Sequence, residues 1–360
     1  MQASAPAADR LRVALLGCGR IARMVHVDIL RCLPGVELVA VADSDGGNLA
    51  ALADRVPGVR TFNDFATAIA ESNADAVVIA LPPALHAPAA IQALRAGKHV
   101  YVEKPIAINA EQALSLLGEW RTGGPTAVIG FNYRFHPHIV ELGRAIRDGD
   151  LGEIIAVRSA FAVPPRDQPH WRSVREQGGG ALLELGSHHL DLIHVLFDAD
   201  VAQVSANVRS VQSGADTAVV QCRLENGVPV QSFFSTAAAA EDQWEVIGTR
   251  GRLHVNRESG IASLTKTQGP GGRLAALRAR LAAVTSALRG VISPAGDPSH
   301  ERSFKAFADA VRGGSMTCAD PLDGWRSLCL ILAAEASATA ERAVDPRTFP
   351  QYSRHAVQTS

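Results

Sequence analysis

Residues 11–22 read Leu-Arg-Val-Ala-Leu-Leu-Gly-Cys-Gly-Arg-Ile-Ala, an apolar run that ends in a glycine loop. The apolar run is typical of a buried strand, and the loop after it opens a helical pattern. Gly17 permits the tight turn, Gly19 lets the backbone approach a pyrophosphate, and Ala22 allows close helix–strand packing. We therefore expect the start of this helix, including Arg20 and Ile21, to bind the diphosphate of a dinucleotide.

Asp43 ends the second apolar strand, residues 36–42, near the offset of about 20 residues expected after the glycine loop. A carboxylate there can accept hydrogen bonds from the ribose hydroxyls, and it repels a 2′-phosphate. Since no arginine follows directly, the sequence predicts NAD in preference to NADP. The simpler alternative is that Asp43 caps the next helix.

Apolar strands alternate with helical patterns as far as residue 131, which predicts a doubly wound parallel sheet covered on both faces. The pattern then changes to strands joined by hairpin turns, among them Asn226-Gly227. We expect an α/β fold: a Rossmann NAD-binding domain over 1–131, and over 132–360 an α+β substrate and oligomerisation domain with an open, mainly antiparallel sheet.

An insertion is expected at about 268–299, where glycine and proline flank a helical stretch that has arginines but no acidic residue. Packing on its own domain or a partner subunit is the first interpretation. A lid over the site and a membrane-surface helix are the alternatives.

Two strand ends carry further candidates, because ligands of parallel sheets bind at the carboxyl edge. Leu81 and Pro82 end one strand, and we expect Pro82 to shape the wall beside the nicotinamide. His86 follows, either as a cofactor contact or as a helix cap. Lys104 ends the next strand after Glu103, and we expect Leu81, Glu103 and Lys104 to contact the cofactor. The Lys104 ammonium group can also donate a hydrogen bond to a carbinol oxygen.

The glycine run 178–180 opens a helix that carries Glu184, His188 and Asp191. Spacings of four and three place these side chains on one helical face. His188 suits a general base, since the unperturbed pKa of histidine lies near 6.5. Asp191 and His189 are alternatives for the base. A metal at these carboxylates with His86, His136 or His170 is a further alternative, but no metal is expected, because nicotinamide chemistry with a lysine needs none.

Together these motifs resemble the Gfo/Idh/MocA oxidoreductases, which include inositol dehydrogenases and glucose–fructose oxidoreductases. The resemblance rests on the glycine loop, on Glu103-Lys104-Pro105, on the glycine-opened helix, and on residues 130–137, Gly-Phe-Asn-Tyr-Arg-Phe-His-Pro. It covers about residues 10–345. It implies that Lys104, Glu184 and His188 serve catalysis, although glutamate stands at 184 where the family has aspartate.

Substrate contacts are expected from residues 130–137, through Asn132 and Arg134, and from Trp171 and Arg172, in addition to Glu184 and His188. An aromatic face and a guanidinium group can recognise polyols and acidic sugars. The alternative for Trp171 is a buried loop anchor.

The chain has 360 residues, 47% of them hydrophobic and 20% charged, with a formal net charge of −1. This composition gives no argument for nucleic acid as a partner, and no apolar run is long enough to suggest a membrane span. Five scattered cysteines suggest neither disulfides nor a zinc knuckle. We expect a cytoplasmic protein, and the resemblance implies a homodimer or homotetramer.

The predicted function is NAD(P)-dependent oxidation or reduction of a carbinol carbon in a small-molecule sugar, polyol or sugar derivative. One alternative is a relative that retains NAD while it cleaves a glycosidic bond. Another is a non-catalytic protein that senses NAD or a sugar.

Overall fold

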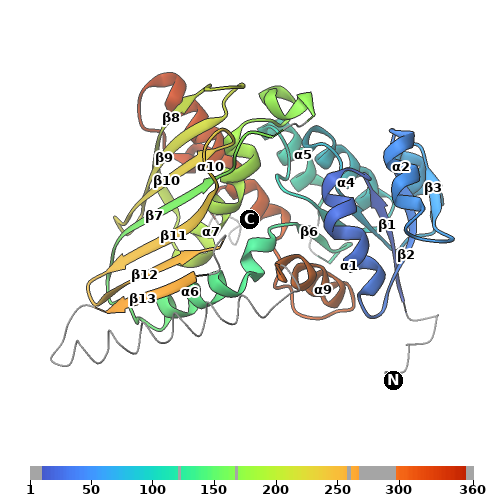
Figure 1. Cartoon of the computed structure of the whole chain (residues 1–360), viewed down its shortest axis with the longest axis horizontal. Helices are drawn as coiled ribbons and strands as arrows, with labels where there is room; N and C mark the ends of the chain where they lie inside the picture. Colours follow the sequence, from blue (N-terminus) through green and yellow to red (C-terminus); the bar gives the residue numbers. More distant parts are fainter. Residues whose placement is uncertain (1–9, 121–122, 167–168, 258–260, 267–296, 354–360) are drawn as a thin grey trace. The chain divides into compact units, whose positions relative to one another are not determined.

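The computed structural model describes residues 10–120, 123–166, 169–257, 261–266 and 297–353. The chain forms two compact units. Unit 1 comprises 1–132, 176–178 and 299–325, and unit 2 comprises 133–175, 179–298 and 326–360. Each unit is built on one sheet (Figure 1).

Sheet A of unit 1 has six parallel strands in the order β3-β2-β1-β4-β5-β6. The chain runs outward from β1 to β3 and then returns to β4, so right-handed crossovers place the helices on both faces. The predicted parallel sheet is confirmed. Its strands are β1 (Leu11–Leu16), β2 (Val36–Ala42), β3 (Arg60–Phe62), β4 (Ala76–Ile79), β5 (His99–Val102) and β6 (Ala127–Ile129).

The helices of unit 1 follow the expected crossovers, with one departure. The helix after the glycine loop begins with a π-turn, η2 (Ala22–His26), before it continues as α1 (Val27–Cys32). The other helical elements are α2 (Gly46–Ala53), α3 (Phe65–Glu71), η3 (Pro83–Leu85), α4 (His86–Arg95), α5 (Ala110–Glu119) and α9 (Ser299–Val311). The short element η4 (Asn132–Phe135) begins at the last residue of this stretch and continues into unit 2.

The segment 299–325 groups with unit 1, whereas the sequence analysis assigned it to the second domain. Long-range contacts explain the difference. The Ile129 N–H donates to Ala319 O at 2.9 Å, and the Phe304 ring stacks on Tyr101 with centroids 4.5 Å apart. Such contacts between distant segments leave no periodic pattern in the sequence.

Sheet B of unit 2 has seven strands in the order β13-β12-β11-β7-β10-β9-β8. Among the described strands of sheet B, only β7 and β10 pair in parallel, so the expected mainly antiparallel sheet is confirmed. Buried and exposed residues alternate along β9, which indicates one covered and one open face. The strands are β7 (Ile154–Ala162), β8 (Val201–Arg209), β9 (Thr217–Leu224), β10 (Pro229–Ser235), β11 (Glu241–Gly248), β12 (Gly251–Asn256) and β13 (Ile261–Lys266).

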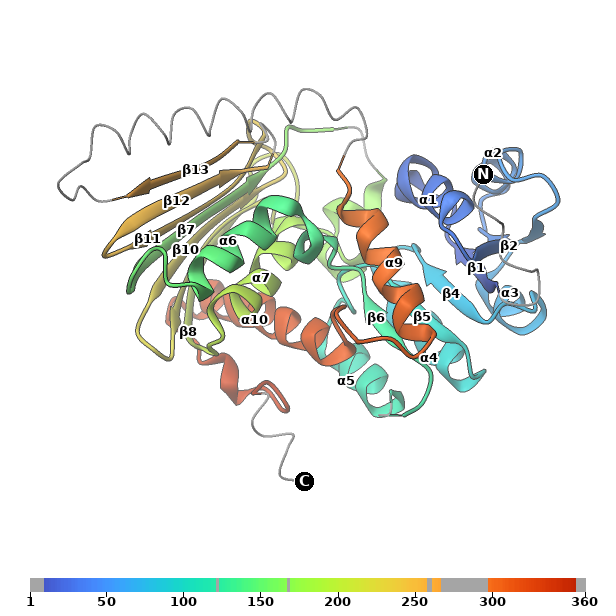
Figure 2. The ribbon, with the colours of Figure 1, turned by 90° about the horizontal axis from the view of Figure 1, so that it is seen from below.

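Helices cover one face of sheet B, where Figure 2 shows α6 and α7 lying along the strands. The glycine-opened helix again begins with a π-turn, η7 (Leu182–Gly186), and continues as α7. The remaining helical elements are α6 (Pro137–Arg147), η5 (His170–Ser173), η6 (Arg175–Gln177), α7 (Ser187–Phe197), α10 (Pro321–Ala340) and η8 (Pro346–Thr348).

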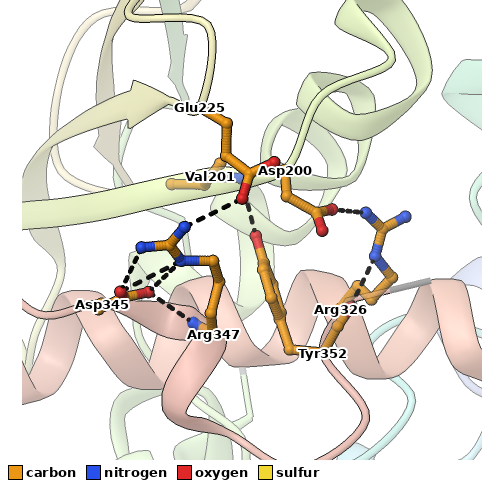
Figure 3. A network of polar contacts seen from close by, with 7 residues as sticks. All are labelled: Asp200, Val201, Glu225, Arg326, Asp345, Arg347 and Tyr352. Atoms are coloured by element: carbon orange, nitrogen blue, oxygen red, sulfur yellow. Dashed lines mark hydrogen bonds and ion pairs between the residues drawn. The ribbon is translucent and has the colours of Figure 1, made fainter. Parts of the chain in front are cut away.

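Polar contacts fasten the C-terminal segment to β8 at the edge of sheet B (Figure 3). Arg326 pairs with Asp200, and its Nε donates to Tyr352 O at 3.0 Å. The Val201 N–H donates to the Tyr352 hydroxyl at 3.2 Å, and Arg347 pairs with Glu225 at 3.0 Å. Val344 forms an antiparallel bridge with Val204 of β8, with both N–H···O bonds at 2.8 Å, so the segment covers part of an edge that would otherwise be open to pairing with another chain.

Among the residues that the structure describes, no helix combines the length and apolar character that a membrane crossing requires. The expected insertion at 268–299 lies outside the described residues except for 297–299. Its three interpretations stay predictions.

Candidate active site

The glycine loop after β1 has the geometry that a dinucleotide requires. Gly17 has a φ of +97°, and a Cβ there would lie 2.5 Å from Ala80 O, so only glycine fits. A Cβ at Gly19 would meet nothing within 4 Å, so this side of the loop is open to a ligand. Arg20 and Ile21 are exposed beside it. A close turn with an open backbone face fits the pyrophosphate group of NAD.

Asp43 lies against the same loop. Its carboxylate accepts hydrogen bonds from the Cys18 N–H at 2.7 Å and the Asp45 N–H at 2.8 Å. The cap of α2 is instead Asp45, which accepts from the Asn48 N–H at 2.7 Å. The helix cap that was the alternative role for Asp43 is therefore supplied by Asp45. Asp43 lies at the end of β2, where a ribose would be recognised.

The ends of β4 and β5 are tied together by His86. Its ring nitrogens lie 2.7 Å from Pro105 O and 2.8 Å from Leu81 O. The imidazole is buried, and burial lowers its pKa. Both nitrogens contact main-chain oxygens, so the side chain holds the two strand ends, one of which carries Lys104, rather than presenting a nitrogen to a ligand. Pro82, beside Leu81, is half-buried at the same edge.

Lys104 is half-buried two residues beyond β5, and its bond to Pro105 is cis. The preceding Glu103 is buried, with Oε1 2.9 Å from His26 Nε2. Burial alone would raise the pKa of Glu103, but His26, His300 and Lys104 together lower it to about 2. Glu103 is therefore a carboxylate at neutral pH.

Asn132 also belongs to unit 1. It is buried, and its amide donates to Ser299 Oγ at 2.7 Å.

The residues of unit 1 that sequence analysis assigned to the cofactor gather at the carboxyl edge of sheet A, after β1, β2, β4 and β5.

In unit 2, close backbone contact explains the glycine run before η7. A Cβ at Gly179 would lie 2.3 Å from Arg172 O, and Gly180 has a φ of +95°. The π-turn that follows contains Glu184, so the four-residue spacing to His188 does not follow the α-helical period assumed from the sequence. Such turns are frequent at functional sites.

His188 is held in a stack of rings. It is buried, and its ring lies nearly parallel to that of Tyr133, with centroids 4.1 Å apart and planes inclined by 16°. The Arg257 guanidinium lies 3.4 Å from the Tyr133 centroid. Two groups this close cannot share one ring face, so Tyr133 is sandwiched between Arg257 and His188. The stack fixes the plane of the imidazole.

Asp242 anchors this stack. It accepts hydrogen bonds from the Tyr133 hydroxyl at 2.8 Å and from Arg257 at 2.5 Å, and it lies 3.3 Å from His189 Nε2. Burial opposes the charge, but the three donors lower the pKa of Asp242. Burial also lowers the pKa of His189, which packs on Trp244 with ring centroids 4.9 Å apart.

The remaining candidates form two ion pairs. Glu184 pairs with Arg172, whose guanidinium lies 4.9 Å from the Trp171 ring centroid. Arg134 donates to Asp191 at 2.8 Å, and both side chains are nearly buried. Because Asp191 is held by a permanent cation, His188 is the better base of the two.

Sequence analysis missed the roles of Tyr133, Asp242, Arg257 and His26. Tyr133 lies within the 130–137 segment, which was one available signal. Asp242 lies in β11 and Arg257 directly follows β12, and the pairing of these strands brings them together, with the Arg257 N–H donating to Asp242 O at 2.7 Å.

Comparison with known proteins agrees with these observations. The model of the oxidoreductase family with an NAD-binding Rossmann fold matches residues 11–158, and that of the GFO/IDH/MocA C-terminal domain matches residues 139–254.

Three curated relatives are each 30% identical to the chain. They are a dTDP-3,4-didehydro-2,6-dideoxy-alpha-D-glucose 3-reductase of Actinomadura kijaniata (69% of this chain and 76% of the relative covered), an inositol 2-dehydrogenase of Rhodococcus erythropolis (73% and 77%), and a 1,5-anhydro-D-fructose reductase of Ensifer adhaerens (94% and 99%).

Among solved structures, the WlbA dehydrogenase from Bordetella pertussis, in complex with NADH and UDP-GlcNAcA, has the same fold. The TM-score is 0.80 at 24% identity, covering 93% of this chain and 97% of the other. The two domain matches, the 30% identical relatives and the NAD-type glycine loop place this chain in the Gfo/Idh/MocA family of oxidoreductases.

Proposed function

We propose that the protein transfers a hydride between NAD and a carbinol carbon of a sugar, a polyol or a sugar derivative. The observation that carries the proposal is the buried His188, whose ring is fixed in plane at 4.1 Å from Tyr133 on the glycine-opened helix. The curated relatives support the substrate class, because each is named for a carbohydrate or a cyclitol.

Each group has a chemical role in this proposal. NAD supplies the acceptor for the hydride when it is bound. His188 takes the hydroxyl proton, and Lys104 donates a hydrogen bond to the carbinol oxygen while negative charge develops there. Glu184 keeps the Arg172 guanidinium in place beside Trp171, so that this pair can meet the substrate's hydroxyl or acidic groups.

Lys104→Met and His188→Asn should each lower kcat by at least about a hundredfold, the scale of one acid–base group. The binding of NADH should change little, because neither residue belongs to the glycine loop. In His188→Asn the limb of the pH–rate profile that rises toward alkaline pH should flatten. Near-wild-type turnover by Lys104→Met would contradict the mechanism.

An absorbance assay at 340 nm, with NAD and a panel of sugars and polyols, separates the alternatives. Sustained formation of NADH supports the dehydrogenase. Product without net NADH would favour an enzyme that retains NAD while it cleaves a glycosidic bond. Binding without turnover would favour a non-catalytic protein that senses NAD or a sugar.

NAD is the preferred cofactor in this proposal, because Asp43 at the end of β2 repels a 2′-phosphate. The dissociation constant for NADH should be lower than that for NADPH. Asp43→Ser should bring the ratio of these two dissociation constants closer to one. Asp45→Ser is the matched control, because it removes a neighbouring carboxylate while its hydroxyl can still cap α2, and it should leave the ratio unchanged. Tighter binding of NADPH by the wild type would rule the preference out.

We also propose a cytoplasmic homodimer or homotetramer, as the family resemblance implies. Light scattering after size exclusion tests the oligomer, and cell fractionation tests the compartment.

A further inference from the structure

Three potential metal ligands from distant parts of the sequence meet in unit 1. His26 ends the π-turn η2, Glu103 follows β5, and His300 lies in the first turn of α9. One ligand atom of each lies within 4.8 Å of the others. No motif in the sequence brings these three together, and the function proposed above uses none of the histidines.

The contact between His26 and Glu103 differs from an ordinary hydrogen bond. His26 Nε2 and Glu103 Oε1 are 2.9 Å apart, yet neither atom has a hydrogen-bond partner of acceptable alignment, and His26 Nδ1 has none either. An imidazole with no exposed side-chain surface and two unsatisfied nitrogens requires an explanation. Two ligands of one ion direct their lone pairs at a third point, and in a tetrahedral site with bond lengths of about 2.0–2.2 Å they lie about 3.3–3.6 Å apart. Binding an ion would therefore move His26 Nε2 and Glu103 Oε1 a few tenths of an ångström apart.

The donor set determines which ion would fit. Two imidazole nitrogens and one carboxylate oxygen are ligands that zinc accepts, whereas calcium and magnesium prefer oxygen alone. Aromatic rings pack beside His26: Phe304 meets the His26 ring edge-on at 5.1 Å and stacks on Tyr101. A low-polarity shell strengthens the attraction between the ion and the carboxylate.

We propose that His26, Glu103 and His300 bind a divalent transition-metal ion of the zinc class. The ion ties the glycine-loop helix, the end of β5 and α9 to one another, with water in the position that the protein leaves open. This proposal replaces the expectation, drawn from the sequence, that the protein holds no metal. It concerns stability of unit 1 and stands apart from the proposed hydride transfer.

The test uses the full-length chain without a polyhistidine tag. After dialysis against Zn²⁺, the wild type should retain one more tightly bound ion per chain than His300→Gln, measured by elemental analysis. Added Co²⁺ should give the visible d–d absorption of a nitrogen- and oxygen-liganded ion. His300→Gln should bind the ion at least about tenfold more weakly, since even indirect partners of a metal contribute that much.

His300 is the residue to change first, because it is partly exposed and its replacement leaves the buried His26 in place. His170→Gln removes an exposed histidine of unit 2 and is the matched control, which should bind as the wild type does. The melting temperature should rise with Zn²⁺ in the wild type and in the control only. Equal binding by the wild type and His300→Gln, or no binding by either, would overturn the proposal.

Discussion

Each unit contains a buried histidine next to a buried carboxylate, but the two carboxylates have different further partners. In each, a glycine loop opens a helix that begins with a π-turn, and a buried histidine on or after that turn faces a buried carboxylate. In unit 1 the pair is His26 and Glu103, 2.9 Å apart, and in unit 2 it is His189 and Asp242, 3.3 Å apart. In the sequence, Glu103 of the first pair directly precedes Lys104, and His189 of the second pair directly follows His188.

The difference lies in the other partners of each carboxylate. Asp242 is also bound by Arg257 and by the Tyr133 hydroxyl, so its counter-charge is permanent. The lowered pKa of Glu103 depends chiefly on the imidazoles of His26 and His300, with a smaller contribution from the Lys104 ammonium group. A buried charge is costly when its partner is removed, but a histidine can avoid that cost by losing its proton, and arginine cannot.

Removal of each carboxylate measures this difference most directly. Asp242→Asn leaves the Arg257 guanidinium buried with one fewer counter-charge, so it should lower the free energy of unfolding by about 3–5 kcal/mol. Glu103→Gln should cost about 1–3 kcal/mol, the range for leaving a buried hydrogen-bonding group without its partner. Urea unfolding at neutral pH, without added metal, gives both values.

Asp309→Asn is the matched control, since Asp309 forms an exposed pair with Lys305 on α9. It should change the free energy of unfolding by less than about 1 kcal/mol. An equal or larger loss in Glu103→Gln than in Asp242→Asn would show that the comparison between titratable and permanent partners is wrong.

Acid titration of stability tests the charge state of Glu103. The pKa of Glu103 is lowered to about 2 in the folded chain, against about 4.3 for an unperturbed glutamate. When the pH falls below the pKa that Glu103 has in the unfolded chain, the unfolded state binds a proton that the native state does not bind. The contribution of Glu103 to stability is therefore complete above that pH and is lost as the pH falls toward 2. The loss should reach about 3 kcal/mol in metal-free protein.

Glu103→Gln should remove this part of the acid-induced loss. Because burial lowers the pKa values of His86 and His189, a separate loss should begin as pH falls below 6.5 in both proteins. Stability curves from urea unfolding at a series of pH values test this. Parallel curves for the wild type and Glu103→Gln below pH 4 would contradict the assignment to Glu103.

Most of the fold followed from local patterns. The strand expected at 36–42 is Val36–Ala42, and the hairpin expected at Asn226-Gly227 joins β9 to β10, because apolar runs and turn residues act locally. The glycine loop and Asp43 lie together because each follows one of two neighbouring parallel strands, β1 and β2. The two π-turns were not predicted, since one extra residue per turn leaves no distinct sequence signal.

The parts of the site that were missed depend on contacts between distant residues. Arg257 is on Tyr133 only because β12 pairs with β11, and His26 meets Glu103 only because β1 and β5 lie in one sheet. A motif shows which residues are available for chemistry. It does not show which buried charges hold them in position.

The smallest expected effect concerns the Tyr133 hydroxyl. Tyr133→Phe keeps the ring between Arg257 and His188 but removes one of three donors to Asp242, so it should cost about 1 kcal/mol of stability and lower kcat by less than about tenfold. Tyr133→Leu removes the flat face on which His188 rests, so it should lower kcat further and change the pH–rate limb assigned to His188. If Tyr133→Phe and Tyr133→Leu have the same kcat and the same pH profile, the ring does not position His188, and the stack contributes only to packing.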